Sequence, residues 1–311
     1  MRQDFFIADP EQPIRAELFS VERLEQHARS LAEAQGVAKR ARRRRPLPKR
    51  LRENAKILVD SFREIAHSAQ AHRPITPAGE WLLDNFHVVE EQIREIRNDL
   101  PADYYAQLPK LEDGPLAGYP RVYGMAWALV AHTDSAFDFE KLTRFVDAYQ
   151  KVTPLTIGEL WAIAVTLRLT LIENLRRLAQ SIVRRAQQTE EADAIADRVL
   201  AAETDAAFAR IIDDVSDRSL FAATISRLEQ KLRDRDGSPA KFLHWIGEKI
   251  ASQGMSTEQV VREEYQTQGA VNVSVRNLIT SMRLLSDIDW TVFVESISLV
   301  DRGLSADSDF E

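Results

Sequence analysis

The apolar residues of this 311-residue chain recur mostly at steps of three and four, the spacing of one face of an α-helix. From about residue 51 onward this spacing is almost continuous. One shorter helix is predicted before it, with its apolar positions at Leu18, Val21, Leu24, Ala28 and Leu31. The pattern therefore predicts an all-α fold, in the form of a multi-helix bundle.

The predicted helices are separated by prolines, glycines and capping residues. Their ranges are 51–71, 77–100, 122–132, 138–151, a long helix from 157, and then 190–202, 204–213, 218–234, 239–253, 256–268, 273–285 and 290–301. Thr76 and Ser238 are predicted N-caps, because each is followed by a proline at the first helical position. Residues 101–124 hold four prolines and three glycines beside several tyrosines, which predicts an ordered loop laid over the helices.

The helix that begins near residue 157 is predicted to lie at the centre of the bundle. Thr156 and Glu159 have the Thr-x-x-Glu spacing of a capping box at its start. Beyond them the apolar residues form two stripes, and a helix that is apolar on two sides is buried on both. Its most apolar window, 157–172, also holds Glu159 and Arg168 and is shorter than the roughly 20 residues of a membrane span. We therefore predict a buried helix without a transmembrane role.

The composition excludes several classes of protein. Without cysteine, the chain has no disulfide and no cysteine-based zinc site. Its 11 glycines and 12 prolines are too few for the closely spaced turns of a β-sandwich or barrel. Lys and Arg number 41 against 48 Asp and Glu, and the net charge of −7 argues against a surface that binds nucleic acid throughout. No export signal is visible at the N-terminus.

Residues 39–52 form a basic segment, with nine lysines or arginines in fourteen positions around two prolines. Repulsion between like charges, together with the prolines, predicts a disordered arm there in place of a packed helix. We expect three parts: a short helix and the basic arm over 1–50, an all-helical domain over 51–302, and a polar tail over 303–311.

The charge of this arm allows three interpretations: binding to anionic lipid, binding to nucleic-acid phosphate, or a plain tether. No aromatic residue is interleaved with the basic ones, so base stacking is not predicted and nucleic acid is the less favoured partner. The residues expected to contact an anionic surface are Arg42, Arg43, Arg44, Arg45, Lys49 and Arg50.

The sequence shows no complete catalytic or metal-binding constellation. Glu64 and His67 have the Glu-x-x-His spacing used by di-iron bundles, but that class of site needs a second copy, which is absent. The three Asp-x-Asp pairs follow no apolar strand of the kind that positions a sugar-nucleotide site. We predict no catalytic residue and no metal ligand in this chain.

Five aromatic residues in or near the loop 101–124 are candidates for stacking on a sugar. Aromatic residues in helices and ordered loops more often pack in the core with their polar atom hydrogen-bonded, so both interpretations stay open. The candidates for glucan binding are Trp81, Tyr104, Tyr105, Tyr119 and Tyr123.

Several strings closely resemble the N-terminal region of bacterial cyclic β-1,2-glucan synthases. They are PITPAGEWLLDNFHVVEEQIREIRNDLP, YYAQLPKL, GPLAGYPRVYGMAWALVAHTDS, PLTIGELWAIAVTLRLTLIENLRRLA and NVSVRNLITSMRLLSDIDW. The resemblance covers approximately residues 50–302 in order. It implies a very large inner-membrane parent protein, in which such a region precedes a membrane-embedded glycosyltransferase domain and a phosphorylase-like domain that sets glucan length.

The resemblance implies a division of labour within such a parent. UDP-glucose and a divalent cation are implied for the glycosyltransferase domain, and the catalytic carboxylates and membrane helices lie beyond the matched region. We therefore expect a fragment, ending near the polar tail, that is inactive alone and acts as an accessory scaffold on the cytoplasmic side of the inner membrane. Its expected partners are the remainder of the synthase, the anionic membrane surface and β-1,2-glucan. The alternatives are a catalytic component of the glycosyltransferase, and a nucleic-acid or membrane-surface adaptor that uses the basic arm.

Overall fold

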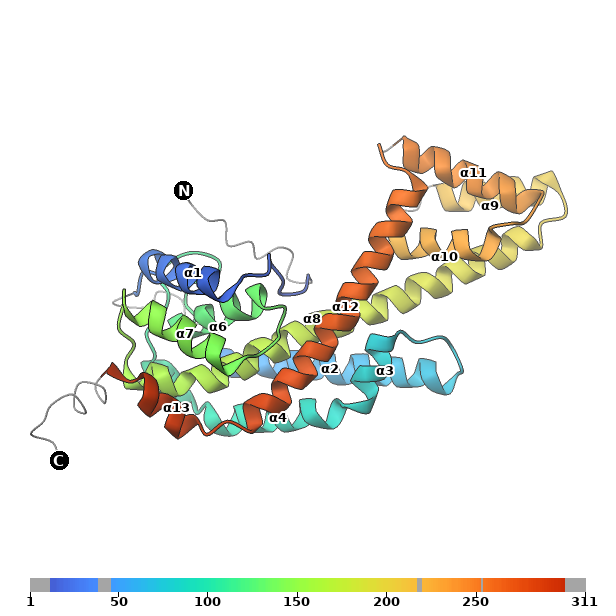
Figure 1. The fold of residues 1–311 in the computed structure, drawn as a ribbon. Helices are drawn as coiled ribbons and strands as arrows, with labels where there is room; N and C mark the ends of the chain where they lie inside the picture. Colours follow the sequence, from blue (N-terminus) through green and yellow to red (C-terminus); the bar gives the residue numbers. More distant parts are fainter. Residues whose placement is uncertain (1–11, 39–45, 217–219, 253, 300–311) are drawn as a thin grey trace, which may run out of the picture. The chain divides into compact units, whose positions relative to one another are not determined.

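The structure, a computed structural model, describes residues 12–38, 46–216, 220–252 and 254–299. Within these ranges the chain forms helices joined mostly by short loops and no β-sheet, which confirms the predicted all-α fold (Figure 1). The helices are α1 (Val21–Ala34), α2 (Leu47–Gln70), α3 (Pro77–Asp84), α4 (Phe86–Asp99), α5 (Ala102–Gln107), α6 (Arg121–His132), α7 (Phe139–Gln150), α8 (Ile157–Leu200), α9 (Asp205–Ser216), α10 (Ala222–Leu232), α11 (Ser238–Ala251), α12 (Thr257–Ser286) and α13 (Trp290–Ile297).

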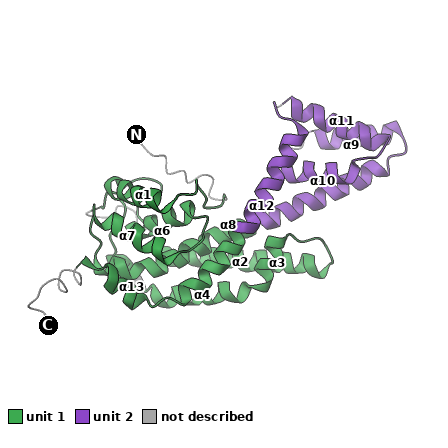
Figure 2. Ribbon diagram, viewed as in Figure 1, with its two compact units in different colours: residues 1–180, 274–311 green, residues 181–273 purple. Residues whose placement is uncertain are grey.

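The helices form two compact units, which the single predicted domain over 51–302 did not anticipate (Figure 2). Unit 1 consists of residues 1–180 and 274–311, and unit 2 of residues 181–273. The chain leaves unit 1 within α8 and returns to it within α12. Unit 2 is therefore an insertion between two parts of unit 1.

Unit 1 is built around the first half of α8. Every residue from 162 to 179 is buried, which agrees with the predicted central helix that is apolar on two sides. Around it α1 packs against α6 and α7, α2 packs against α3 and α4, and α13 packs against α7. The largest fully buried side chains of this unit are Tyr123, Tyr149 and Phe145.

The proline- and glycine-rich loop is ordered, as the sequence predicts, and it contains the short helix α5. After α5 the backbone makes isolated bridges between Val37 and Leu111 and between Lys110 and Pro120. Leu111 N–H donates to the Tyr119 carbonyl at 2.9 Å, which closes the loop on itself. The chain before α2 is thereby tied to the start of α6.

Unit 2 has its own hydrophobic core, formed where one face of each helix meets its neighbours. α10 packs against α11, and the second half of α8 contributes alanine, isoleucine and valine side chains. The buried residues of this core are Ala192, Ile195, Ala196, Val199, Ile211, Val215, Ile225, Leu228, Leu232, Phe242, Ile246, Ile250 and Val260. These side chains explain the helical apolar spacing over this part of the sequence.

Two predicted helix boundaries are wrong because the helices continue. α8 runs without interruption to Leu200, although a separate helix was predicted over 190–202. No glycine or proline follows Gly158 in α8, and its polar stretch is rich in glutamine and glutamate, which sustain a helix. α12 likewise joins the predicted helices 256–268 and 273–285, because a single Gly269 costs only about 1 kcal/mol relative to alanine.

Another predicted helix, over 77–100, is divided at Asn85 into α3 and α4. The buried Asn85 amide donates to the Trp81 carbonyl at 2.7 Å and accepts from Arg283, so its side chain competes with the helical ladder. The Thr76 cap is confirmed by its bond to Gly79 N–H at 3.1 Å. At α11 the N-cap is Gly237, with φ of 78°, and not the predicted Ser238.

The structure describes only the second part of the basic segment 39–52. Residues 39–45, with Arg42 to Arg45, lie outside the described residues. From Leu47 onward the segment is helical, against the prediction, because Pro46 is the N-cap and Pro48 lies in the first turn, where a missing N–H costs nothing. Lys49 pairs with Glu53 at 3.8 Å, which moderates the repulsion between like charges.

Two histidines meet where the N-terminal segment covers α6. The Phe19 ring stacks on His132 at 3.8 Å between centroids, and the His27 ring meets the edge of His132 at 4.6 Å. His132 Nδ1 lies 2.8 Å from the Glu17 carbonyl oxygen. Burial, with a smaller effect from His132, lowers the pKa of His27 from 6.5 to about 4. The folded protein therefore favours the neutral form of His27.

His27 should make unit 1 lose stability as the pH falls from 6.5 towards 4. In that window the unfolded chain binds the proton more strongly, so folding opposes protonation, and the loss between pH 7 and 5 is about 2 kcal/mol. Urea unfolding followed by circular dichroism at both pH values measures it. His27→Gln should flatten this dependence, while His87→Gln, at an exposed site of α4, should retain it. Equal pH dependence in all three proteins would contradict the assignment.

Candidate functional site

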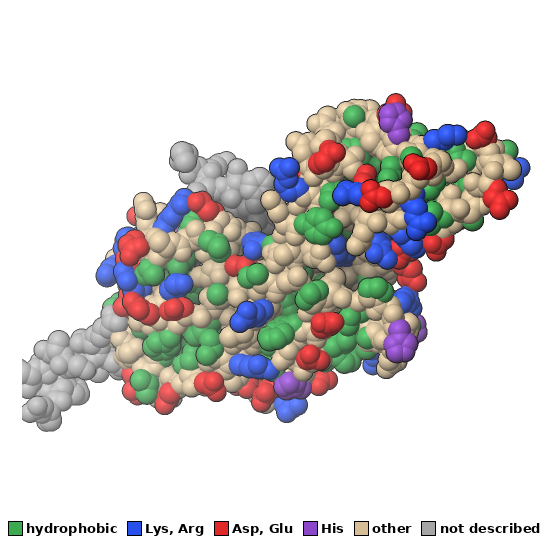
Figure 3. All heavy atoms as spheres, turned by 45° about the vertical axis from the view of Figure 1, so that its right-hand side comes forward, with side chains coloured by type: hydrophobic (Ala, Val, Ile, Leu, Met, Phe, Trp, Pro, Cys, Tyr) green, Lys and Arg blue, Asp and Glu red, His purple; other side chains and the backbone are tan. Residues whose placement is uncertain are grey.

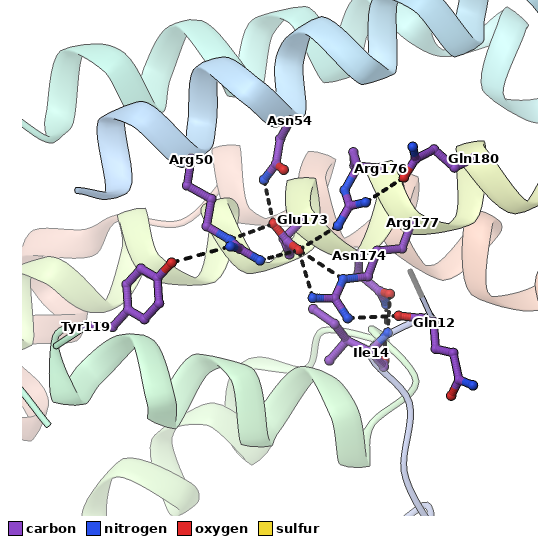
Figure 4. Close-up of polar contacts among 10 residues, drawn as sticks. All are labelled: Gln12, Ile14, Arg50, Asn54, Tyr119, Glu173, Asn174, Arg176, Arg177 and Gln180. Atoms are coloured by element: carbon purple, nitrogen blue, oxygen red, sulfur yellow. Dashed lines mark hydrogen bonds and ion pairs between the residues drawn. The ribbon is translucent and has the colours of Figure 1, made fainter. Parts of the chain in front are cut away.

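The most prominent polar cluster of the described residues surrounds Glu173 in α8 (Figure 4). Its side chain is 0% exposed. Arg50 of α2 binds both carboxylate oxygens, with Nη2 2.7 Å from Oε1 and Nε 2.9 Å from Oε2. Arg176 and Arg177 donate to Oε1 at 3.0 and 2.9 Å, and Asn54 of α2 donates to Oε2 at 2.7 Å. One carboxylate thus accepts from three guanidinium groups and an amide.

The electrostatics of this cluster hold Glu173 ionised. Burial alone would raise the pKa of Glu173, but Arg50, Arg177 and Arg176 outweigh it and lower the pKa from 4.5 to about 2. The guanidinium of Arg177 also lies over the Trp127 ring, 4.9 Å from its centroid, and donates to the Gln12 carbonyl at 2.9 Å. A buried charge without partners costs several kcal/mol. The burial of Glu173 in α8 therefore requires these partners to be in place.

The adjacent Asn174 fixes the segment that precedes α1. Its Oδ1 accepts from Ile14 N–H at 2.6 Å, and its Nδ2 donates to the Ile14 carbonyl at 3.2 Å and to Ser135 Oγ at 2.9 Å. Together the side chains of Glu173, Asn174 and Arg177 therefore join α8 to α2, to the N-terminal segment and to the loop after α6.

A second buried pair lies at the start of α8. Arg121 donates to Glu159 through Nε at 2.7 Å and Nη2 at 2.6 Å, and Glu159 is 0% exposed. Thr156 Oγ1 accepts from Glu159 N–H at 3.2 Å, while Glu159 Oε2 accepts from Thr156 N–H at 3.0 Å, so the predicted capping box is confirmed. Glu159 therefore caps α8 and at the same time neutralises Arg121 of α6.

A third polar junction joins α12 to the loop between α6 and α7. Asp134 has φ of 48°, and its carboxylate accepts from Ser274 Oγ at 2.5 Å and from Arg15 at 3.0 Å. Ser281 Oγ donates to the Ser135 carbonyl at 2.6 Å. These bonds hold the returning part of the chain within unit 1.

The five predicted sugar-stacking residues are not gathered on one open surface. Tyr105, Tyr119 and Tyr123 are buried, at 6%, 6% and 0% exposure. The rings of Tyr119 and Tyr123 contact each other, and Arg50 donates to Tyr119 Oη at 3.3 Å. As placed, these three rings offer no face to a sugar.

The other two candidates, Tyr104 and Trp81, are more exposed than these three rings. Tyr104 is half-buried and its hydroxyl donates to the Gly158 carbonyl at the start of α8. Trp81 lies on α3 and is 38% exposed. Sugar binding at Tyr104 and Trp81 stays a prediction.

Of the residues predicted for an anionic surface, the structure describes only Lys49 and Arg50. Lys49 is exposed in the first turn of α2, whereas Arg50 belongs to the Glu173 cluster. Arg50 is therefore a structural residue, because its guanidinium is held by both oxygens of the Glu173 carboxylate. Over the described ranges, no group of three potential ligands is placed to hold a metal ion, and no helix is both long and apolar enough to cross a bilayer.

Nearly the whole chain is similar in sequence to part of a known protein. Over 297 residues, 96% of its length, the chain is 35% identical to the cyclic β-(1,2)-glucan synthase NdvB of Rhizobium meliloti (strain 1021). The predicted resemblance to the cyclic β-1,2-glucan synthases is confirmed. The similarity is longer than the expected span of residues 50–302. It covers 10% of the length of NdvB, so the chain corresponds to a small part of that synthase. No family model matches the chain.

The Glu173 cluster was not predicted, although the sequence carries a signal for it. Glu173, Arg176 and Arg177 interrupt a helix whose two apolar stripes predict burial on both sides. Charged residues in such a helix are buried and need partners, which predicts an ion-pair cluster. The partner from α2 lies 123 positions away in the sequence, and no local pattern identifies it.

Glu173→Gln should destabilise unit 1 by about 3–5 kcal/mol at pH 7, because it leaves the buried guanidinium groups of Arg176 and Arg177 and the half-buried one of Arg50 without a carboxylate. Urea unfolding measures the effect. Glu53→Gln, which removes an exposed carboxylate from the neighbouring α2, should change the unfolding free energy by less than about 1 kcal/mol.

The same pair of variants should respond differently to acid. The pKa of Glu173 lies below its unfolded value, so its contribution is present above pH 4.5 and is lost as the pH falls from 4.5 towards 2. The difference between wild type and Glu173→Gln should shrink in that window. A Glu173→Gln protein as stable as Glu53→Gln at pH 7 would refute the role of the cluster.

Proposed function

We propose that this chain is a non-catalytic helical scaffold segment of a cyclic β-1,2-glucan synthase. The observation that carries the proposal is the 35% identity to NdvB across 96% of the chain, confined to 10% of the NdvB length. Nearly the whole chain is thus similar to one limited part of a much longer synthase. In this proposal UDP-glucose and a divalent cation are bound by other parts of such a synthase.

The buried charged side chains of unit 1 pair with one another between helices, which supports a scaffold role. A catalytic acid or base must come within hydrogen-bonding reach of the substrate. Glu159 and Glu173 are instead 0% exposed and accept hydrogen bonds from arginines of other helices. Arg168 similarly pairs with Glu95 of α4 at 3.1 Å. The charged side chains in the buried part of α8 therefore serve to join helices.

We further propose that the basic segment brings the chain to an anionic membrane surface on the cytoplasmic side. Arg42, Arg43, Arg44 and Arg45 follow one another in sequence, and Lys49 is exposed nearby. On the face drawn in Figure 3, basic and acidic side chains lie intermixed over each unit, so no comparable run of one sign competes with the segment there. Basic residues near anionic lipid contribute about 1 kcal/mol each.

The scaffold proposal predicts that the purified chain does not turn over UDP-glucose with Mg²⁺ or Mn²⁺. The measurement is release of UDP and transfer of glucose to linear β-1,2-glucan acceptors. Turnover that survives repurification and is lost when a carboxylate of this chain is replaced would overturn the proposal. It would favour the alternative of a catalytic component of the glycosyltransferase.

The membrane proposal predicts that replacing Arg42, Arg43, Arg44 and Arg45 with glutamine weakens binding to phosphatidylglycerol-containing vesicles by more than about tenfold. Cosedimentation measures the binding. A control with the same change of net charge replaces four exposed arginines elsewhere, namely Arg63, Arg94, Arg97 and Arg210, and should bind like wild type. Equal loss in both variants would point to net charge alone and would contradict a dedicated surface.

A further inference from the structure

Unit 2 contains an open groove between the end of α10 and the first half of α12, with a volume of about 500 Å³. This lies within the range of about 300–1,000 Å³ that is usual for small-molecule sites. The groove is formed by residues of unit 2 alone. Its walls include Glu229 and Arg233 on the α10 side and Thr257, Arg262, Tyr265 and Gln266 on α12.

Tyr265 is the feature that distinguishes this groove from an ordinary helix junction. The residue is 57% exposed, although tyrosine as a residue type is intermediate in burial. The preceding residue, Glu264, is buried and paired with Arg185 of α8, which holds that side of α12 inward. The Tyr265 ring is therefore presented at the groove by a helix that this ion pair holds against α8.

The charges that line the groove balance each other. Arg233 lies 3.5 Å from Glu229, and Arg262 and Glu258 are one helical turn apart on α12. Thr257 adds a hydroxyl group and Gln266 an amide, so donors and acceptors both surround the exposed ring. Val261 adds an aliphatic side chain beside that ring, so the groove combines an apolar surface with the polar groups around it. A phosphate-bearing ligand would require an excess of positive charge, which the lining lacks. This lining instead suits a neutral ligand that carries many hydroxyl groups on an apolar ring.

We propose that the groove of unit 2 binds a segment of neutral β-1,2-linked glucan, with Tyr265 stacking on a glucose ring and the surrounding polar side chains bonding its hydroxyl groups. The class of ligand follows from the groove, while the choice of a β-1,2-glucan rests on the proposed function. The site differs from the aromatic group around residues 101–124, which belongs to unit 1.

Calorimetric titration of the purified chain with linear β-1,2-glucooligosaccharides tests this site. Wild type should bind, and Tyr265→Ala should weaken binding by about tenfold or more, because the stacking surface is lost. Phe221→Ala removes another exposed ring of unit 2 outside the groove, at 54% exposure, and should bind like wild type. Equal thermal unfolding of the three proteins shows that the groove variant is folded.

Two results would overturn the site: no binding by wild type, or unchanged binding by Tyr265→Ala. Unchanged binding by Tyr265→Ala together with loss of binding in Trp81→Ala would place the sugar on unit 1. UDP-glucose turnover would overturn the scaffold proposal independently of the titration. Glucan binding without turnover would support both the scaffold proposal and the glucan site. Absence of binding in the titration would overturn only the glucan site.

Discussion

The arrangement of unit 1 depends on an ionised carboxylate placed in the middle of an apolar helix. Glu173 cannot be buried alone, because transfer of a charge from water to the interior of a protein costs several kcal/mol. Its burial is compatible with folding only if Arg50, Arg176 and Arg177 arrive together with it. Because Arg50 comes from α2, the ion pair selects one position of α2 along α8. Apolar packing would tolerate neighbouring positions, whereas hydrogen-bond geometry at two carboxylate oxygens does not.

The features that could be predicted from the sequence are those whose partners lie within one helical turn. The predicted capping box of Thr156 with Glu159 is present, and Ser256 forms a similar box with Gln259 at the start of α12. The apolar spacing likewise predicted the central position of α8, because a helix with an apolar stripe on each of two sides is buried on both. Helix ends without a strong local signal were predicted poorly. Asn85 divides α3 from α4, because its side-chain amide donates a hydrogen bond to the Trp81 carbonyl of α3 and accepts one from Arg283, which is remote in sequence.

The exposure of the aromatic side chains could not be predicted from the local sequence. Tyr119 and Tyr123 stand in a segment rich in turns, which suggests exposure. Tyr119 instead lies just before α6 and Tyr123 in the first turn of α6, and both rings are part of the core. Tyr265 stands in a polar helical sequence without any motif and is exposed. Whether a tyrosine faces solvent depends on how neighbouring helices pack, and that information is distributed over residues far apart in the chain.

The insertion of unit 2 into unit 1 has a consequence for the order of events during synthesis. Domains generally fold as they emerge from the ribosome, N-terminal parts first. Unit 2 is complete once residue 273 has emerged, whereas unit 1 still lacks the later part of α12 and all of α13. The bonds of Ser274 to Asp134 and of Ser281 to Ser135 cannot form before that point. The unit that starts first on the ribosome is therefore the one that finishes last, and the loop after α6 must wait for partners that are translated after the whole of unit 2.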